Sequence, residues 1–343
     1  MTRPEFSGAS VLVVGGAGFV GSNLVVDLLE HGAERVTIVD NLLSSNASNI
    51  PVDERVNFIY GSIADQRILN QIPVHLDFVW HLACYHGNQS SIADPIADHD
   101  NNTLTSLMLF EHLSKMHPLP KVVYAAAGCA VAEKTEDDPL ATPEDAPISL
   151  FHDSPYSISK IIGEMYGNYY FAQYGLPFVR ARFQNVYGPR EVLGAGQWRG
   201  TPATVWRNVV PTFIWRAINN QPLLLDNEGN SSRDFIYIDD IVTGLVLCAT
   251  RGASGNSYNL ASGTETLIRE LAAMIVDIAG SESSIELGPP RDWDHSLRRF
   301  GDPSKASRLL GFEAKTGLKE GITKTFQWTT TNRKFIASEV NRH

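Results

Sequence analysis

The chain has 343 residues, 43% of them hydrophobic and 19% charged, which is ordinary for a folded protein with one large domain or two joined lobes. Its formal net charge of −10 argues against a nucleic-acid-binding surface, because such a surface normally carries a basic stripe. No apolar run approaches the roughly 18 residues of a membrane span, and the first residues show no signal-peptide pattern. The three cysteines, Cys84, Cys129 and Cys248, have neither disulfide nor metal-ligand spacing, so we expect a cytoplasmic protein without a metal site.

Short apolar runs rich in β-branched or aromatic residues predict the strands of the first half of the chain. Strands that are apolar on both faces are typical of a parallel sheet with helices on both sides. A helix is predicted over 19–31, where leucines recur at helical spacing before Gly32. The alternation of strands and helices predicts a doubly wound parallel α/β sheet. The predicted strands are residues 10–16, 35–40, 56–61, 77–83, 121–127 and 177–183.

The second half changes character, with long loops that contain scattered Gly, Pro and Trp. A strand followed by a helix is predicted over 233–249, and another strand over 256–262. We therefore expect a main domain over 1–183, to which 234–262 returns. A smaller, interwoven α/β lobe should comprise 184–233 and 263–335.

The glycines of the sequence VLVVGGAGFVGSNL suggest a dinucleotide-binding loop. Gly15, Gly18 and Gly21 lie between the first strand and the first helix, where a tight turn, close approach to a pyrophosphate and close helix packing each require glycine. Asp40 ends the second strand, where a carboxylate would accept hydrogen bonds from the adenosine ribose. Because Asp40 would repel a 2′-phosphate and 41–43 contain no Arg, the sequence favours NAD over NADP.

Tyr156 and Lys160 are the strongest candidates for catalysis. They are four residues apart in SPYSISK and therefore share one face of a predicted helix. A lysine ammonium beside a phenol and a nicotinamide cation favours the phenolate and lowers the pKa of the tyrosine. Such a tyrosine can take the proton of a sugar hydroxyl while a hydride leaves the same carbon to NAD.

With these motifs the chain resembles the extended short-chain dehydrogenases/reductases, in particular the NAD-dependent nucleotide-sugar epimerase/dehydratase family of the UDP-glucose 4-epimerase type. The resemblance runs from residue 11 to about 328. It implies an NAD-binding Rossmann domain over 1–183, a substrate-binding smaller lobe, and a homodimer formed by helices near 103–115 and 156–174. It also implies a role in carbohydrate biosynthesis, with a sugar linked to UDP, GDP or CDP and epimerised at C4 through a transient 4-keto sugar. The segments that carry the resemblance are GGAGFVGSNL, DFVWHLAC, YSISK, RFQNVYGPR, RDFIYIDD and DPSKASRLLGF.

The resemblance also implies roles for individual residues. Tyr156 and Lys160 would be the catalytic pair. Cofactor contacts would come from Gly15, Gly18, Phe19, Val20, Asp40, Asn41, Ser62, Ile63, Leu82, Ala83, Cys84, Asn102 and the catalytic pair. Asn185, Arg233 and Arg291 would bind the diphosphate of the substrate, and Asp294 its ribose. The predicted substrate-binding set is His86, Asn185, Arg199, Val210, Arg233, Arg291 and Asp294.

The sequence departs from the family at the end of the fifth strand. The family carries a Ser or Thr there that helps to move the proton, whereas this chain has Gly128. Tyr156 must then contact the hydroxyl directly, or water or Cys129 must substitute. The acidic pair of the 4,6-dehydratases is also missing, since Cys129 and Ala130 stand in its place.

Three alternatives to C4 epimerisation stay open. Cys129 lies about one position from the acid/base cysteine of GDP-mannose 3,5-epimerases, so epimerisation at C3 or C5 is the first. Nucleotide-sugar dehydration is the second, and an NAD-binding regulator without catalysis is the third. Arg199 and its neighbouring tryptophans either shape the sugar pocket or pack between the lobes.

Overall fold

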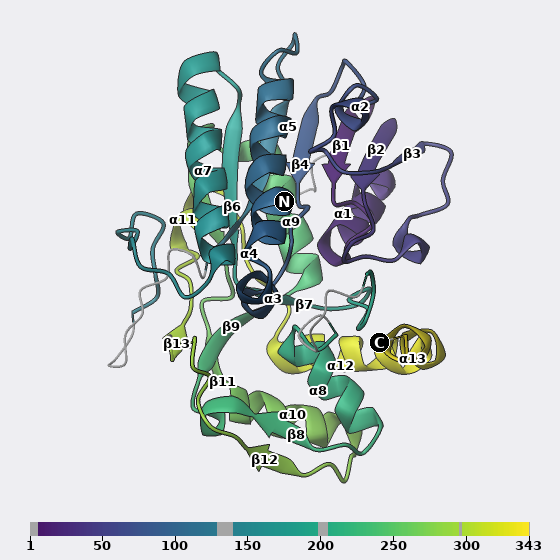
Figure 1. Ribbon diagram of the computed structural model, residues 1–343, viewed down its shortest axis with the longest axis vertical. Helices are drawn as coiled ribbons and strands as arrows, with labels where there is room; N and C mark the ends of the chain where they lie inside the picture. The colour runs from purple at the N-terminus through teal and green to yellow at the C-terminus, as the bar shows by residue number, and fades with distance from the viewer. Residues whose placement is uncertain (1–5, 129–139, 198–204, 295–296, 343) are drawn as a thin grey trace.

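The computed structural model describes residues 6–128, 140–197, 205–294 and 297–342. A large lobe, built on a parallel sheet between helices, occupies the upper part of Figure 1. A smaller lobe of short strands and helices lies below it, and the chain passes between the two lobes several times. Within these described ranges, no helix combines the length and the apolar character needed to cross a bilayer.

The large sheet has seven parallel strands in the order β10-β6-β5-β4-β1-β2-β3. Six of them form within the predicted apolar runs, and the predicted doubly wound parallel fold is confirmed. The strand order reverses between β1 and β4, which opens a crevice at the carboxyl ends of these two strands. The strands are β1 (Ser10–Val14), β2 (Arg35–Asp40), β3 (Val56–Tyr60), β4 (Phe78–His81), β5 (Lys121–Ala127), β6 (Phe178–Phe183) and β10 (Ser257–Leu260).

Both faces of this sheet are buried. Alternate residues of β1 show this directly, because Val11 and Val13 belong to one apolar cluster while Leu12 and Val14 belong to another. On one face α1 packs against α9, and on the other α5 packs against α7. The helices are α1 (Phe19–Glu30), α2 (Gln66–Leu69), α3 (Asn88–Ala93), α4 (Pro95–Asp98), η2 (His99–Leu104), α5 (Thr105–Leu113), α7 (Pro155–Tyr174) and α9 (Ile238–Arg251), with a short η1 (Ala47–Asn49).

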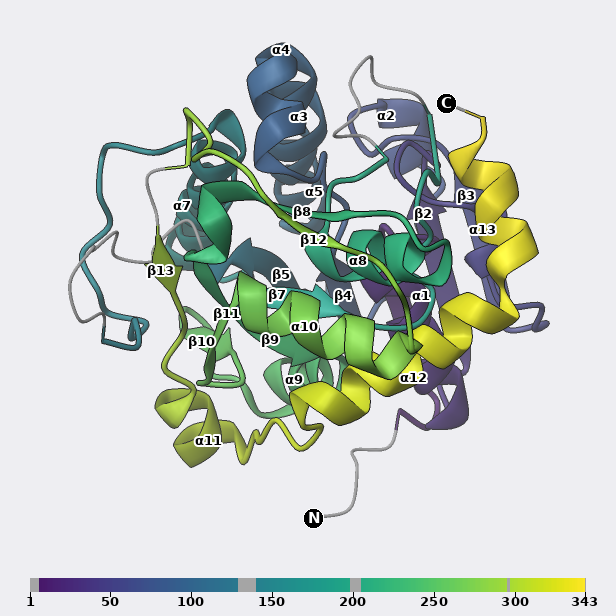
Figure 2. The ribbon, with the colours of Figure 1, turned by 90° about the horizontal axis from the view of Figure 1, so that it is seen from below.

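The smaller lobe is built around β9 (Ser232–Tyr237). This strand pairs in parallel with β7 and β13 and antiparallel with β11. A separate parallel pair joins β8 to β12, and α8, α10 and α12 pack against one another beside it, as Figure 2 shows from below. The other elements are β7 (Asn185–Tyr187), β8 (Leu223–Leu225), β11 (Glu265–Leu267), β12 (Ile285–Leu287), β13 (Arg298–Arg299), α8 (Val209–Ile218), α10 (Ile268–Ala279), α11 (Ser304–Leu310), α12 (Leu318–Thr331), α13 (Arg333–Val340) and η4 (Asp226–Gly229).

The chain returns from the smaller lobe to the large sheet through α9 and β10. The strand and helix predicted over 233–249 form as β9 and α9. Residues 234–237 lie in the sheet of the smaller lobe, so the return starts at Ile238 rather than at residue 234. After α9 crosses the face of the large sheet, β10 pairs with β6 and completes that sheet.

Candidate active site

A cavity of about 600 Å³ lies between the two lobes. Its walls include the carboxyl ends of β1, β2, β5 and β6 from the large lobe and residues of α8, β9 and 290–299 from the smaller one. In doubly wound sheets, ligands bind outside the carboxyl ends of the strands at the point where the strand order reverses. The cavity occupies that position.

The glycine loop at one end of the cavity leaves no room for side chains. Gly15 has φ +87°, and a Cβ there would lie 2.5 Å from the backbone nitrogen of Ala83. At Gly21 a Cβ would lie 2.8 Å from the Cα of Gly16, so the helix packs directly on the loop. Helix α1 follows Gly18 without a side-chain cap, so its first N–H groups can face a ligand. This arrangement fits a pyrophosphate at the start of α1.

Asp40 is held rigidly at the end of β2. One carboxylate oxygen accepts from the backbone nitrogen of Ala17 (3.0 Å), and the other accepts from the backbone of Leu42 (2.8 Å) and the hydroxyl of Ser45 (3.0 Å). Burial raises the pKa of Asp40, and these hydrogen bonds act in the opposite direction. The carboxylate lines the cavity, where it can accept from ribose hydroxyls.

Most of the other predicted cofactor positions line the same cavity: Phe19, Val20, Asn41, Ser62, Ile63, Leu82, Ala83 and Cys84. Asn102, the other predicted cofactor residue, is not among the residues that line the cavity. It is buried behind the wall, where it accepts from the backbone nitrogen of Tyr85 (2.7 Å) and donates to Asp98 (2.7 Å) and Ser159 (3.2 Å). Asn102 therefore ties the loop after β4 to α7.

Tyr156 and Lys160 lie on the first turns of α7, on one face of the helix as predicted. The side chain of Ser154 caps this helix by accepting from the backbone of Ser157. Tyr156 is only 9% exposed and packs against Ala127, while the ammonium of Lys160 lies 5.8 Å from the centre of its ring. The ring of His86 meets that of Tyr156 edge-on, with 5.8 Å between centres. All three residues line the cavity.

The opposite end of the cavity holds the predicted anion-binding residues. Arg233 forms an ion pair of 2.8 Å with Asp294, and Arg291 forms one of 2.5 Å with Asp226. The amide of Asn185 donates to the carbonyl oxygen of Asp234 (3.2 Å). The structure thus brings six predicted substrate residues to one cavity: His86, Asn185, Val210, Arg233, Arg291 and Asp294. Arginine forks held by carboxylates in this way can turn to a diphosphate when it enters.

Arg299 and Glu191 are among the charged residues of the cavity wall that the sequence analysis did not single out. Arg299 is 8% exposed, its guanidinium lies 4.0 Å from Asp294, and its Nε has no hydrogen-bond partner among the described residues. Glu191 is buried, which raises its pKa to about 7, although Asn208 donates to its carboxylate. The signal for Arg299 was the doubled arginine of LRRF, since neighbouring residues of a strand face opposite sides.

Gly128, which stands at the position of the family's Ser or Thr, is not among the residues that line the cavity. The side chain of Gln184 occupies the space that a side chain at Gly128 would need. Gln184 is itself among the residues that line the cavity. Cys129 and Arg199, the remaining predicted site residues, lie outside the residues that the structure describes.

Comparison with known proteins decides the family. The model of the NAD-dependent epimerase/dehydratase family matches residues 11–261. The chain belongs to this family. The resemblance, the fold and the cofactor expected from the sequence are confirmed, since NAD is the cofactor of the family and the glycine loop and Asp40 are built to hold it.

Members of the family with named activities align over nearly the whole chain. A putative UDP-glucose 4-epimerase of Methanocaldococcus jannaschii is 30% identical over 325 residues, which are 94% of this chain and 99% of that protein. The dTDP-glucose 4,6-dehydratase of Streptomyces antibioticus is 28% identical over 332 residues, 94% and 93% of the two chains. The crystal structure of Bordetella bronchiseptica WbmF in complex with NAD+ and UDP has a TM-score of 0.88 and 51% identity, covering 98% of this chain and 97% of that one. The family is therefore shown, while its members divide between epimerases and dehydratases.

Proposed function

We propose that this protein is a nucleotide-sugar 4-epimerase that acts on a UDP-linked sugar. The observation that carries the proposal is that one cavity joins the Tyr156–Lys160 pair to the arginines of the smaller lobe. The pair suits removal of a hydroxyl proton, and the arginines suit a diphosphate. UDP is the first choice of nucleotide because WbmF, similar to this chain over almost its whole length, was solved with UDP.

Each residue then has a defined task. Arg233 and Arg291 exchange their carboxylate partners for the diphosphate, and Asp294 contacts the ribose of the nucleotide. The sugar extends towards Tyr156, whose phenolate takes the proton of the C4 hydroxyl. When bound, NAD supplies the hydride acceptor and donor that interconverts carbinol and ketone at C4. Lys160 holds a positive charge beside the phenol through both steps, and Tyr156 returns the proton once the keto sugar has presented its opposite face.

Dehydration and epimerisation at C3 or C5 use the same first oxidation and differ afterwards. Dehydration at C4–C6 is disfavoured because residues 129 and 130 are Cys and Ala where the 4,6-dehydratases carry acidic residues. Epimerisation at C3 or C5 needs a second acid/base beside the sugar, for which Cys129 is the candidate. A regulator without catalysis would not need a tyrosine and lysine so placed in the cavity.

Product analysis in heavy water separates these reactions. Purified protein is incubated in D2O with UDP-, GDP- and CDP-sugars, and the products are resolved by NMR. A C4 epimer without deuterium on carbon is the expected result, because the hydride returns to the carbon that it left. Deuterium at C3 or C5, or a 4-keto-6-deoxy product, would replace this proposal with one of the alternatives. An absence of any product, with NAD demonstrably bound, would contradict enzymatic function.

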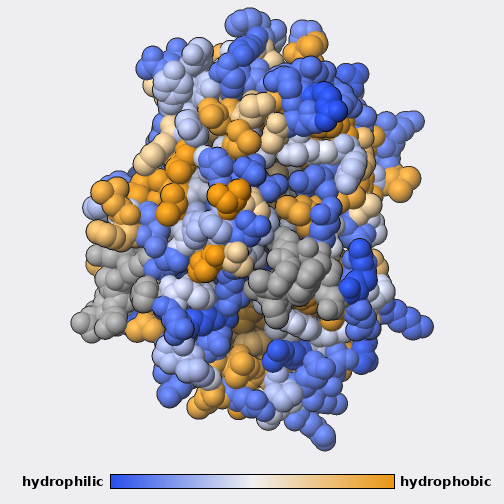
Figure 3. Space-filling model, in the orientation of Figure 1, coloured by the Kyte–Doolittle hydropathy of each residue, from blue (hydrophilic) through white to orange (hydrophobic). Residues whose placement is uncertain are grey.

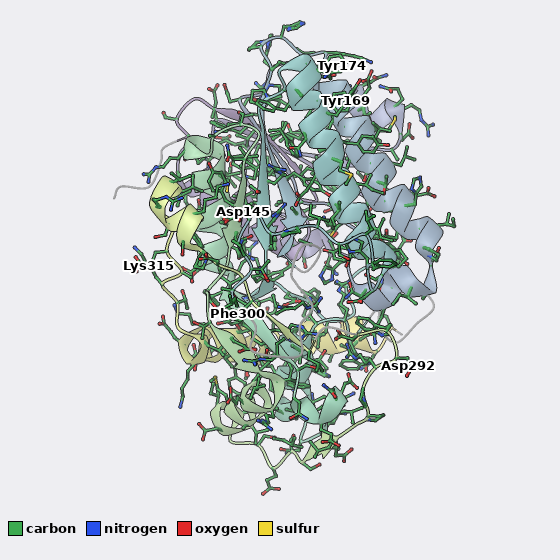
Figure 4. All side chains as sticks on the ribbon, turned by 90° about the vertical axis from the view of Figure 1, so that its left-hand side faces the viewer. Asp145, Tyr169, Tyr174, Asp292, Phe300 and Lys315 are labelled. Atoms are coloured by element: carbon green, nitrogen blue, oxygen red, sulfur yellow. The ribbon has the colours of Figure 1, made fainter. Side chains whose placement is uncertain are left out.

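We also propose a homodimer formed through α5 and α7. The outer face of α7 exposes Ile158, Met165, Tyr169 and Tyr174, each at 46–57% of its full surface. Figure 4 shows Tyr169 and Tyr174 near one end of this helix, and hydrophobic residues are interspersed with polar ones over the face drawn in Figure 3. Helices α5 and α7 of each copy would bury these side chains of α7 in a four-helix bundle. Light scattering should give twice the monomer mass, and Met165→Glu with Tyr169→Glu should give the monomer.

A further inference from the structure

Gln184 lies between two glycines at the end of β6. A Cβ built on Gly128 would lie 2.7 Å from the side-chain carbon Cδ of Gln184 and closer still to its amide nitrogen. A Cβ built on Gly301 would lie 2.5 Å from the same nitrogen. Real Cβ atoms do not approach other atoms so closely, so the carboxamide depends on the absence of both side chains. Its amide fills the space in which a side chain at Gly128 would begin.

This space is next to the proposed catalytic pair. Gly128 follows Ala127, which packs against Tyr156 in a small buried cluster. Two residues earlier, Ala125 accepts a hydrogen bond of 2.9 Å from Lys160. Residues 125–127, Tyr156, Lys160 and Gln184 all line the cavity. The amide therefore lies on the sheet side of the site, with α7 across from it.

The side-chain amide of Gln184 is available to a ligand as far as the described residues are concerned. Among the described residues, none forms a hydrogen bond with the side chain of Gln184, which is partly exposed to the cavity. A primary amide offers two N–H donors and one oxygen acceptor. Such a group at the wall of a substrate site gains its hydrogen bonds when a polar ligand enters.

We propose that the Gln184 carboxamide takes the place of the missing Ser or Thr hydroxyl and hydrogen-bonds the sugar hydroxyl that Tyr156 deprotonates. The proposal rests on the proposed function. An N–H of Gln184 donates to the hydroxyl oxygen, holds it towards Tyr156, and stabilises the negative charge that grows on this oxygen as the proton leaves. An amide does not exchange protons in the working pH range as a hydroxyl relay can, so the proton passes directly between the sugar oxygen and Tyr156.

The first test is Gln184→Met, which keeps the length of the side chain and removes its hydrogen bonds. Loss of one preorganised donor to a developing oxyanion typically lowers kcat by about 10²-fold. We expect a fall of about that size for the UDP-sugar, with KM and the affinity for UDP changed less than about threefold and the melting temperature almost unchanged. If Gln184 only fills space between the two glycines, the Met variant will turn over at the rate of the unaltered protein.

The second test uses Gly301→Ala, which leaves the amide chemically intact and displaces it. A methyl group at Gly301 would lie 2.5 Å from the amide nitrogen of Gln184 and 3.0 Å from the Cβ of Ala261, so the Gln184 amide is the neighbour that it would displace most. Gly301→Ala should therefore lower kcat in the natural background and have little further effect when combined with Gln184→Ala, which makes room for it. Additive losses, or a loss of UDP affinity equal to the loss of kcat, would overturn the proposal.

A structure with NAD and the UDP-sugar bound separates this proposal from the proposed function. We expect an amide atom of Gln184 within hydrogen-bond distance of the sugar oxygen that faces Tyr156. Turnover by the unaltered protein with Gln184 turned away from the sugar would refute the role of Gln184 and keep the epimerase. A protein that is inactive on every sugar refutes the epimerase, and the bound structure then still decides whether Gln184 contacts the hydroxyl.

Discussion

The ammonium of Lys160 lies 5.8 Å from the centre of the Tyr156 ring and donates a hydrogen bond of 2.9 Å to the carbonyl oxygen of Ala125. This hydrogen bond fixes the lysine between helix and sheet, where it is only 3% exposed. The charge is thereby held close to the phenol, and it also interacts with the carboxylate of Asp98.

Replacement of Tyr156 by Phe should remove the proton acceptor and leave the site otherwise intact. General acid–base groups contribute about 10²- to 10⁴-fold to rates, so kcat should fall within that range. Affinity for UDP, measured by calorimetry, should stay the same because the diphosphate binds at the other end of the cavity. A Phe variant that works at the natural rate would remove the basis of the proposed mechanism.

Asp40 is proposed to bind the cofactor and also stabilises the fold, so Asp40→Asn should lower both the affinity for NAD and the stability of the protein. Hydrogen bonds to a charged group contribute about 1.5–3 kcal/mol, and the neutral amide can accept with only one of its two polar atoms. We expect the free energy of unfolding to fall by about 1–3 kcal/mol and the affinity for NAD to fall about tenfold. Asp77→Asn is the matched control, since that carboxylate also accepts from a backbone nitrogen, that of Ser10 (2.8 Å), but is not among the residues that line the cavity. Unchanged NAD binding by Asp40→Asn would be evidence against ribose recognition by this carboxylate.

Glu191 should make stability depend on pH. Burial raises its pKa from 4.5 to about 7, so its neutral form is favoured in the folded state. Its stabilising contribution is complete below pH 4.5 and is lost as the pH rises through about 7, at a cost of roughly 3 kcal/mol. Glu191→Gln has no carboxylate at this position to ionise. Its free energy of unfolding in urea should therefore rise relative to that of the natural protein between pH 5 and pH 8.

Glu265→Gln is the control for that experiment, because the pKa of Glu265 is shifted in the opposite direction. Arg298 holds its carboxylate and lowers its pKa, so its contribution is present at high pH and is lost as the pH falls. Glu265→Gln should therefore lose stability relative to the natural protein at pH 8 and recover it in acid. The same trend in both variants would show that Glu191 does not carry the effect.

We predict that Arg299 contributes to ligand binding and does not stabilise the ligand-free protein. Replacement by Met removes a buried charge whose nearest carboxylate among the described residues, that of Asp294, is 4.0 Å away, so the free energy of unfolding should stay the same or rise. Loss of a charge-assisted hydrogen bond should weaken UDP-sugar binding about 10-fold or more. The matched control is Arg298→Met, which breaks a partly exposed ion pair with Glu265 worth up to about 1 kcal/mol and should leave binding intact. Lower stability with unchanged binding in Arg299→Met would indicate a structural role.

The sequence predicted the large sheet well because its signals are local. Apolar runs marked six strands, and β2 runs from Arg35 to Asp40 as expected. The glycine loop and the Tyr156–Lys160 pair are also local patterns, each contained in one turn or one helix. Helix α13 was not predicted, since its pattern is mostly polar and its buried contacts come from distant residues such as Trp215.

Site residues that depend on long-range register were harder to find. Arg299 faces the cavity because β13 pairs with β9 in a register that places it opposite Arg233. The role of Gln184 depends on Gly128 and Gly301, which are far apart in the chain and meet only in the folded protein. The hydrogen bonds by which Asn102 joins the loop after β4 to α7 likewise depend on residues that meet only in the folded protein.

The late position of β10 in the chain has a consequence for synthesis on the ribosome. Strand β6 can pair with β5 as soon as residue 183 has emerged, but its other edge stays open until 257–260 arrive. Throughout that interval the nascent chain presents unpaired N–H and C=O groups on an apolar strand, which invites pairing with another chain. Translation that stops anywhere within the intervening smaller lobe should therefore yield an aggregating product rather than a usable NAD-binding half.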